Sequence, residues 1–223
     1  MANPLPPVQW HAKPTGAYAD DSQEGFENAA MIYSELSNRG WTLNAIAGVL
    51  ANLSYEGQLN PWRWQDDIVL ASTDTSLIAT SWEHGYGLAG FTPAGNYIYN
   101  QQAQGYSGYG PNFSDVAGNP NDGNAQVLFI DIQGNNFYWV RNSNYNISFN
   151  DYKISNQTPS WLAAAWMWNY EYPGDPYGQQ PLREAKAIYW YNTFLPYDPN
   201  PPTPPTPTTR KSMPLWMMLR RPF

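Results

Sequence analysis

The sequence predicts a mainly α-helical domain of the α+β type, with one small irregular or β-like insertion. Apolar residues recur at helical spacing in several segments, and a capping residue precedes most of these segments. Residues 58–92 break the pattern, because they are rich in Trp, Asp and Gly and show no helical period. With 223 residues, the chain is long enough to bury one core.

The first two helices carry the clearest signals. Residues 21–24 (DSQE) are typical of an N-cap at Asp21 followed by the acid of a capping box, and Gly40 is expected to end that helix. Thr42 is expected to cap the second helix, which closes at Gly57. The apolar side of this second helix consists of Leu43, Ile46, Val49, Leu50 and Leu53.

Further helices are expected beyond the insertion. Each begins at a polar cap or a proline and is bounded by glycine or proline. The expected segments are 92–105 after Thr92-Pro93, a helix capped by Asp122 and running through Ile132, a short turn over 148–154, a helix from Thr158-Pro159 that ends before Pro173, and a last helix from Gln180-Pro181 to Pro196.

The chain divides into three parts. Residues 1–196 form the folded domain, residues 197–209 a stiff Pro/Thr-rich linker, and residues 210–223 a short segment that is both basic and apolar. We interpret this last segment as a docking peptide for another protein; a membrane-surface anchor and a disordered end are the alternatives. No signal peptide is recognisable, and no stretch approaches the ~20 apolar residues that span a bilayer.

Charge is distributed unevenly. Residues 1–198 hold all 18 acidic residues and seven of the 11 basic ones, which gives a net charge of −11, whereas the last 25 residues carry +4. An acidic body gains nothing from attraction to an anionic cell wall, so we expect it to be delivered to its target. The same charge argues against nucleic acid as a partner.

The chain has no cysteine and only two histidines, His11 and His84. A thiol nucleophile is therefore excluded, and the histidines lack the spacing of zinc ligands, so we expect no metal and no cofactor. For a hydrolase, carboxylate chemistry on a glycosidic bond remains. Aromatic residues make up 16% of the chain, and those in loops, such as Trp62, Trp64, Tyr106 and Tyr109, are expected outside the core, where such rings can stack on sugars.

Glu56 is the strongest catalytic candidate. Val49, Leu53 and Glu56 are spaced by four and three residues, so they share one stripe of the second helix, with Glu56 in its last turn. Partial burial and the negative end of the helix dipole both raise a carboxyl pKa, and a general acid needs this to hold its proton near neutral pH. A solvated glutamate at a helix end is the alternative.

The residues around this glutamate resemble a known family. The chain reads NLSYEGQLNPWRWQDD at 52–67 and HGYGLAGFTPAGNY at 84–97. These segments resemble the lysozyme domain of phage tail proteins, which has a catalytic Glu followed by an NP-W segment and a GYGL-x-QWTP hairpin. The resemblance covers about residues 8–195. It departs at Tyr55, where the family has a small residue, and at Gly90, where the family has glutamine.

The resemblance implies a lysozyme-like fold, a cleft between the helical body and the insertion, and a muramidase or lytic transglycosylase reaction on peptidoglycan with Glu56 as general acid. The second group stays open. Asp66 or Asp67 could stabilise charge or act as a base, and so could the hydroxyl of Thr92. An enzyme with no carboxylate partner would favour the transglycosylase, in which the substrate's own hydroxyl attacks.

The resemblance also implies substrate-binding positions in these motifs. Glu83, His84 and Glu171 flank the motifs and are expected to be solvated or structural. The implied substrate-binding residues are Trp64, Tyr86, Gly87, Leu88, Thr92 and Tyr170.

The leading hypothesis is therefore a virion glycosidase on a phage tail that breaches the host cell wall, docked to other tail proteins through residues 210–223. A free endolysin is an alternative with the same chemistry, although such enzymes commonly add a wall-binding domain, for which the sequence offers no candidate. A tail component that has lost activity and only binds glycan or other subunits is the alternative of a different class, and the departures at Tyr55 and Gly90 favour it.

Overall fold

The computed structural model describes residues 2–13, 15–67, 84–94, 97, 121–133 and 138–199. Within these residues the protein is mainly helical, which confirms the predicted fold class. The helices are α1 (Gln23–Asn38), α2 (Leu43–Leu53), α6 (Asn121–Gln133), α7 (Phe149–Lys153), α8 (Pro159–Trp166) and α9 (Pro176–Phe194), with short helical turns η1 (Gln65–Asp67), η2 (Met167–Glu171) and η3 (Leu195–Tyr197).

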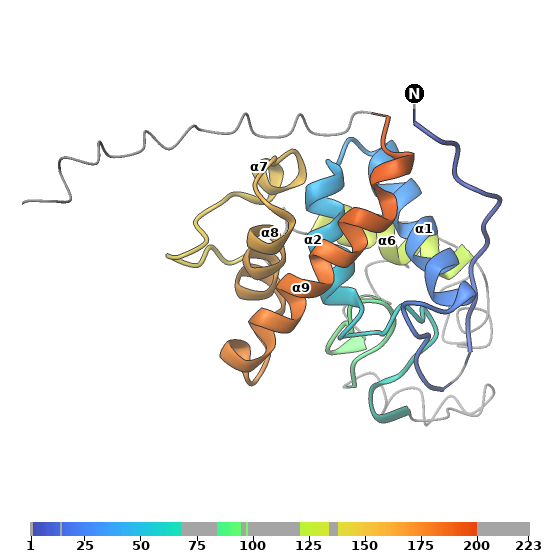
Figure 1. The fold of residues 1–223 in the computed structure, drawn as a ribbon. Helices are drawn as coiled ribbons and strands as arrows, with labels where there is room; N and C mark the ends of the chain where they lie inside the picture. The colour runs from blue at the N-terminus through green and yellow to red at the C-terminus, as the bar shows by residue number, and fades with distance from the viewer. Residues whose placement is uncertain are drawn as a thin grey trace, which may run out of the picture.

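Helix α2 lies at the centre of the body, with α8 and α9 on one side and α1 on the other (Figure 1). All of its residues are buried, so the expected apolar side understates how completely the other helices enclose it. The approach of α8 is close, because a Cβ built on Gly48 would lie 2.9 Å from the carbonyl carbon of Leu162. Glycine at this position therefore permits the two helices to pack backbone to backbone.

The helix caps follow the sequence signals with one small correction. The hydroxyl of Thr42 accepts a hydrogen bond from the Ala45 N–H, and Thr158 caps α8. For α1 the cap is Ser22 rather than Asp21, because the Ser22 hydroxyl accepts from the Gly25 N–H at 3.0 Å. The short helix predicted over 148–154 is confirmed as α7, with Ser148 as its cap.

The predicted start of the last helix is wrong. Helix α9 begins at Pro176 and is capped by Asp175, whose carboxylate accepts from the Gly178 N–H at 3.0 Å. Asp175-Pro176 supplies the same cap and first-turn proline that the prediction assigned to Gln180-Pro181, and Pro181 lies inside the helix. The earlier start matters for the site, because it places Gln179 and Arg183 one turn apart on one helical face.

Some of the predicted segments lie wholly or partly outside the residues that the structure describes. Asp122 lies within α6 and not at a cap. Of the helix expected over 92–105, the described residues are 92–94 and 97; Ala94 and Tyr97 are helical, whereas Thr92 and Pro93 form a bend before them. The linker beyond residue 199 and the segment 210–223 lie outside the described residues. Across the part that is described, no helix combines the length and apolarity needed to cross a membrane.

The N-terminal segment is extended and runs over the surface of the body. The Asn3 N–H donates to the Pro196 carbonyl at 2.9 Å, and the Trp10 indole donates to the Asn124 side chain on α6 at 2.6 Å. Both ends of the described chain therefore meet, at the end of the molecule opposite the insertion (Figure 1).

Candidate active site

The turn that follows α2 carries Glu56. Helix α2 ends at Leu53, so Glu56 lies just beyond the helix and not in its last turn as predicted, although its N–H still bonds to the Asn52 carbonyl at 3.1 Å. The next residue, Gly57, donates to the Leu88 carbonyl at 3.0 Å. A Cβ on Gly57 would lie 2.2 Å from the Gly87 carbonyl oxygen, so this close junction between body and insertion requires glycine.

The described parts of the insertion, residues 58–67 and 84–92, are irregular loops joined by isolated β-bridges, as the sequence predicts. Two isolated antiparallel bridges join Trp64 to Tyr86 and Tyr86 to Phe91. The side chain of Gln126, from α6, accepts from the Leu88 N–H at 2.7 Å and donates to the Pro61 carbonyl at 2.7 Å. Helix α6 thereby fixes both arms of the insertion relative to the turn that carries the glutamate.

Glu56 lies where two hollows adjoin, one of about 290 Å³ and one of about 200 Å³. Gly90 and Thr92 also line both hollows, and the side chain of Glu56 is 27% exposed. The first hollow is bordered by polar insertion residues, which include Arg63, Gln65 and Asp66. The second is bordered by rings and a second carboxyl, which include Phe91, Tyr97, Phe129, Tyr138, Tyr170 and Glu171.

Arg183 of α9 holds the Glu56 carboxylate in an ion pair. Its guanidinium also donates to the side-chain oxygens of Asn52 and Gln179, each at 2.7 Å, and its side chain is only 1% exposed. Asn52 is itself fixed, because its amide donates to the Gly48 and Ala163 carbonyls. The orientation of Glu56 is therefore set by a buried polar network that joins α2, α8 and α9.

Sequence reasoning did not identify Arg183 as a site residue. The available signal was its spacing of four from Gln179, which the incorrect start of α9 concealed.

Tyr55, a position that departs from the family pattern, packs against Arg183. The guanidinium carbon of Arg183 lies 5.6 Å from the centre of the Tyr55 ring. Neither burial nor the helix dipole, the two effects expected to act on Glu56, accounts for this neighbouring cation.

Glu171 is a second site residue that sequence reasoning missed. It ends the π-helical turn η2, where it is partly buried, and the Trp166 indole donates to its carboxyl at 3.0 Å. Burial and, after it, the charge of Glu56 raise the pKa of Glu171 to about 8, although the Trp166 hydrogen bond and the charge of Arg183 oppose the rise. The sequence predicted a solvated or structural role for Glu171, whereas the structure places it in the wall of the second hollow. The NYEYP sequence (169–173) was the signal available for it.

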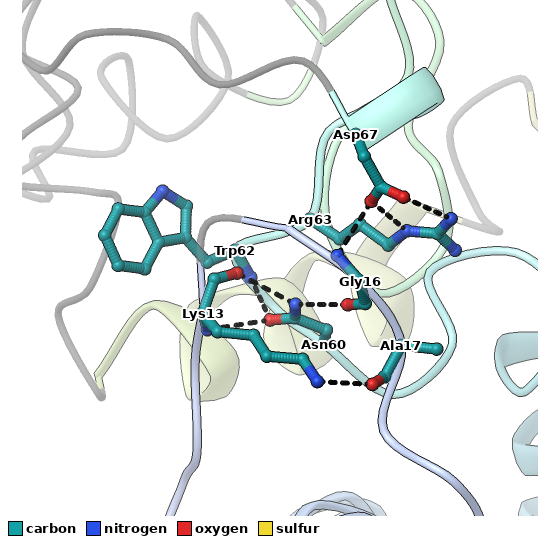
Figure 2. Close-up of polar contacts among 7 residues, drawn as sticks. All are labelled: Lys13, Gly16, Ala17, Asn60, Trp62, Arg63 and Asp67. Carbon is teal, nitrogen blue, oxygen red and sulfur yellow. Dashed lines mark hydrogen bonds and ion pairs between the residues drawn. The ribbon is translucent and has the colours of Figure 1, made fainter.

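The two aspartates of the insertion differ in position. Asp66 is exposed and borders the first hollow. Asp67 bonds instead to the Arg63 guanidinium at 2.9 Å and to the Gly16 N–H at 2.8 Å, as Figure 2 shows. These two hydrogen bonds, with that from Arg63 the larger cause, lower the pKa of Asp67. The geometry therefore favours Asp66 for a role toward substrate and Asp67 for bracing the insertion.

The remaining candidates separate into cleft and core. Thr92 is exposed between the two hollows, with its hydroxyl donating to the Gly90 carbonyl at 2.7 Å, and Tyr170 borders the second hollow. Trp64 was expected outside the core but is only 2% exposed, because its ring packs at 4.7 Å from that of Tyr86; it nevertheless borders the first hollow. Tyr86 and Leu88 are also buried in the core.

Some sequence-based candidates contribute little to the described site. Trp62 is half-buried against the core, while Tyr106, Tyr109 and Glu83 lie outside the described residues. His84 is half-buried at the edge of the insertion, where its carbonyl accepts from Ala94. In the described ranges, no three His, Cys, Asp or Glu side chains gather as metal ligands would.

A helical body, a small insertion packed against the end of its central helix, and a carboxyl-lined cleft at their junction together define a lysozyme-like domain. A sequence profile of the phage tail lysozyme family matches residues 27–194. The chain therefore belongs to the phage tail lysozyme family, which confirms the resemblance seen around Glu56.

A curated relative points to the same biological setting. Over 169 residues the chain is 31% identical to Morphogenesis protein 1 of Bacillus phage B103. The match covers 74% of this chain but only 39% of the relative, so the chain spans well under half of that protein's length. Family and relative together identify a lysozyme-like, phage-associated protein.

Proposed function

We propose that this protein cleaves the glycan strands of peptidoglycan, between N-acetylmuramic acid and N-acetylglucosamine, as the wall-opening component of a phage tail. One observation carries the proposal: Glu56 lies in a cleft, at the junction of two hollows that adjoin along the line between body and insertion. A polymer of sugar rings that occupies both hollows would pass directly over this carboxyl group. Family membership supports the same chemistry.

The two hollows supply different surfaces to a sugar chain. Rings border the second hollow, and flat aromatic faces stack favourably on the apolar faces of sugars. Arg63, Gln65 and Asp66 border the first hollow and offer hydrogen bonds to hydroxyl and acetamido groups. The glycosidic bond to be broken would then lie between these surfaces, beside Glu56.

Cleavage requires a proton on the leaving oxygen and stabilisation of positive charge on the sugar ring. Glu56 is placed to deliver the proton as general acid. Asp66, on the insertion side of the first hollow, is placed to stabilise that charge or to activate water. The hydroxyl of Thr92 borders the same hollow and is the alternative second group.

The central experiment measures clearing of purified peptidoglycan by the wild type and by Glu56→Gln. Loss of an acid catalyst lowers rates by roughly 10²–10⁴-fold, so clearing by the variant should fall by that factor. Glu24→Gln removes an exposed carboxyl from the first turn of α1 and serves as the matched control, with wild-type clearing expected. Equal clearing by wild type and Glu56→Gln would refute the proposal, and no clearing by the wild type would favour the binding-only tail component.

Mass spectra of the released fragments identify the reaction type. Reducing ends show that water attacks the sugar, whereas anhydro ends show that the sugar's own hydroxyl attacks. If Asp66 activates water, Asp66→Asn should remove reducing ends without creating anhydro ends. Anhydro ends produced equally by wild type and Asp66→Asn would assign the protein as a lytic transglycosylase that does not use this carboxylate.

Attachment to the tail is proposed to depend on residues 210–223. A chain truncated after Asn200 should clear purified peptidoglycan as the wild type does, because the site lies wholly within the preceding domain. The same truncation should be missing from assembled particles, as measured by immunoblot of purified virions. Normal incorporation of the truncated chain would contradict the docking role. If no form of the protein is found in particles, the wild type included, the free endolysin becomes the better explanation.

A further inference from the structure

Glu171 is a second carboxyl in the wall of the cleft, and the chemistry proposed for Glu56 does not yet use it. We propose that Glu171 is a functional positioning residue that shares one proton with Glu56, and that this shared proton keeps Glu56 able to act as the acid near neutral pH. The inference rests on the proposed glycosidase function. It concerns a residue that the sequence places beside the motifs and that the structure places in the site.

Glu56 and Glu171 lie in the wall of one hollow. Glu56 follows α2 and Glu171 ends η2, yet both border the same hollow. Arg183 pairs with Glu56, and its charge also acts on Glu171. Two carboxyl groups and one guanidinium thus share a partly buried site. With both carboxyls ionised the group has a net charge of −1, and with one proton added it is neutral.

Burial decides between these two states. Like charges held close together in a poorly solvated site resist joint ionisation, so one proton stays on the pair. In the described part of the chain, the groups that face Glu171 are Glu56, the buried Arg183, the neutral Trp166 indole from α8, and the phenols of Tyr170 and Tyr138. Arg183 is the only cation among these groups, and Glu56, Asn52 and Gln179 already bind its guanidinium.

The direction of the pKa agrees with this arrangement. Burial and the neighbouring Glu56 raise the pKa of Glu171 to about 8, so at neutral pH Glu171 keeps a proton in the same site where Arg183 binds the Glu56 carboxyl. Pairs of carboxyls with separated proton affinities are typical of glycosidase sites.

The proposed step conserves protons and electrons. The proton passes from the Glu171 carboxyl to the Glu56 carboxylate, which leaves the charge of the pair unchanged. Glu56 donates it to the glycosidic oxygen as the bond between that oxygen and the sugar carbon breaks, and the bonding electrons stay with the oxygen. The water or sugar hydroxyl that then attacks the carbon loses a proton, which returns to the pair.

The pH dependence of activity separates this role from a structural one. Wild-type clearing should decline as the pH rises through about 8, where the pair loses its proton. In Glu171→Gln the pair can no longer hold the proton that Glu171 keeps up to about pH 8, so the alkaline decline should move to lower pH by about two units or more. Clearing at pH 7 should then fall roughly tenfold or more, while clearing at the acidic optimum is retained.

Two results would overturn the inference. An unchanged alkaline decline in Glu171→Gln shows that no proton is shared, and an equal loss of activity at every pH shows that Glu171 only supports the fold. Glu184→Gln serves as the control, because this carboxyl pairs with Gln180 on α9, and its pH profile should match the wild type.

A second readout does not depend on activity. Carbon NMR of labelled glutamate should show Glu171 titrating near pH 8 in the wild type and at lower pH in Glu56→Gln, where the neighbouring negative charge is gone. Titration of Glu171 in the ordinary carboxyl range overturns the inference even in an active enzyme. A raised and Glu56-dependent titration in a protein that clears no peptidoglycan refutes the proposed function instead, and with it any catalytic use of the pair.

Discussion

The two walls of the cleft are held in place by different means. On the helical wall, Glu56 is oriented by Arg183 and Asn52, through hydrogen bonds between residues more than 100 positions apart. On the insertion wall, Arg63 pairs with Asp67 four residues away at the protein surface, and the buried Asn60 fastens the loop to the N-terminal segment (Figure 2). The proposed acid is therefore held by long-range contacts within the buried wall, whereas the insertion wall is held by contacts of shorter range.

The largest expected effect is on the buried wall. Arg183→Met removes a cation whose side chain is 1% exposed and leaves Asn52 and Gln179 without its hydrogen bonds. We expect the free energy of unfolding, measured by urea denaturation, to fall by about 3 kcal/mol. Arg63→Met is the matched change on the insertion wall, where the ion pair is partly solvated, and should cost less than about 1 kcal/mol. Equal losses would mean that the two walls do not differ in this way.

An intermediate effect on stability is expected at Asn60, a buried residue of the insertion wall shown in Figure 2. Asn60 is fully buried, and its side chain bonds to the Lys13 and Gly16 carbonyls, each at 2.9 Å, and to the Trp62 N–H at 3.1 Å. Asn60→Ala leaves these groups unpaired, so unfolding free energy should fall by about 2 kcal/mol, with faster proteolysis near residues 13–20.

Asn192→Ala, at an exposed position of α9, is the control for this change and should alter stability by less than about 0.5 kcal/mol. If proteolysis near residues 13–20 were unchanged in Asn60→Ala, the N-terminal segment would be held mainly by its other contacts, such as that of Trp10 with α6.

The smallest effect concerns Asp67, and it depends on pH. The Arg63 and Gly16 hydrogen bonds lower the pKa of Asp67 in the folded state. The stabilisation is therefore fully present above the pKa of the unfolded chain, about 3.9, and is lost as the pH falls through the lower folded value. Asp67→Asn should cost less than about 1 kcal/mol at pH 7, because the side chain is 40% exposed, and nothing in strong acid.

Denaturation of Asp67→Asn at pH 7 and in strong acid measures this difference. Asp66→Asn provides the contrast, since it should affect clearing of peptidoglycan more than stability. A loss for Asp67→Asn that persists in acid would show that Asp67 acts through packing rather than through its charge.

Local signals predicted most of the fold. Thr42, Thr158-Pro159 and Gly40 specify helix ends through interactions within a few residues of each position, and the structure places those ends as expected. The start of α9 was missed because two sequences, Asp175-Pro176 and Gln180-Pro181, carry similar signals, and packing on α2 decides between them.

The site was predictable only in part, for a related reason. Glu56 follows directly from its motif, whereas Arg183 and Glu171 gain their surroundings when α8 and α9 pack on α2, and no local pattern encodes that meeting. The burial of Trp64 could not be predicted from local sequence either. Trp64 lies in a loop, but Tyr86 of the insertion packs against its ring and buries it.

The hydrogen bond between Asn3 and Pro196 has a practical consequence for handling the protein. Because the first and last described segments meet away from the insertion, an affinity tag or a surface-immobilisation handle joined directly before residue 2 or directly after residue 199 should not obstruct the cleft (Figure 1). A chip-bound form of this domain would accordingly present its open groove to long, rigid polymers from solution.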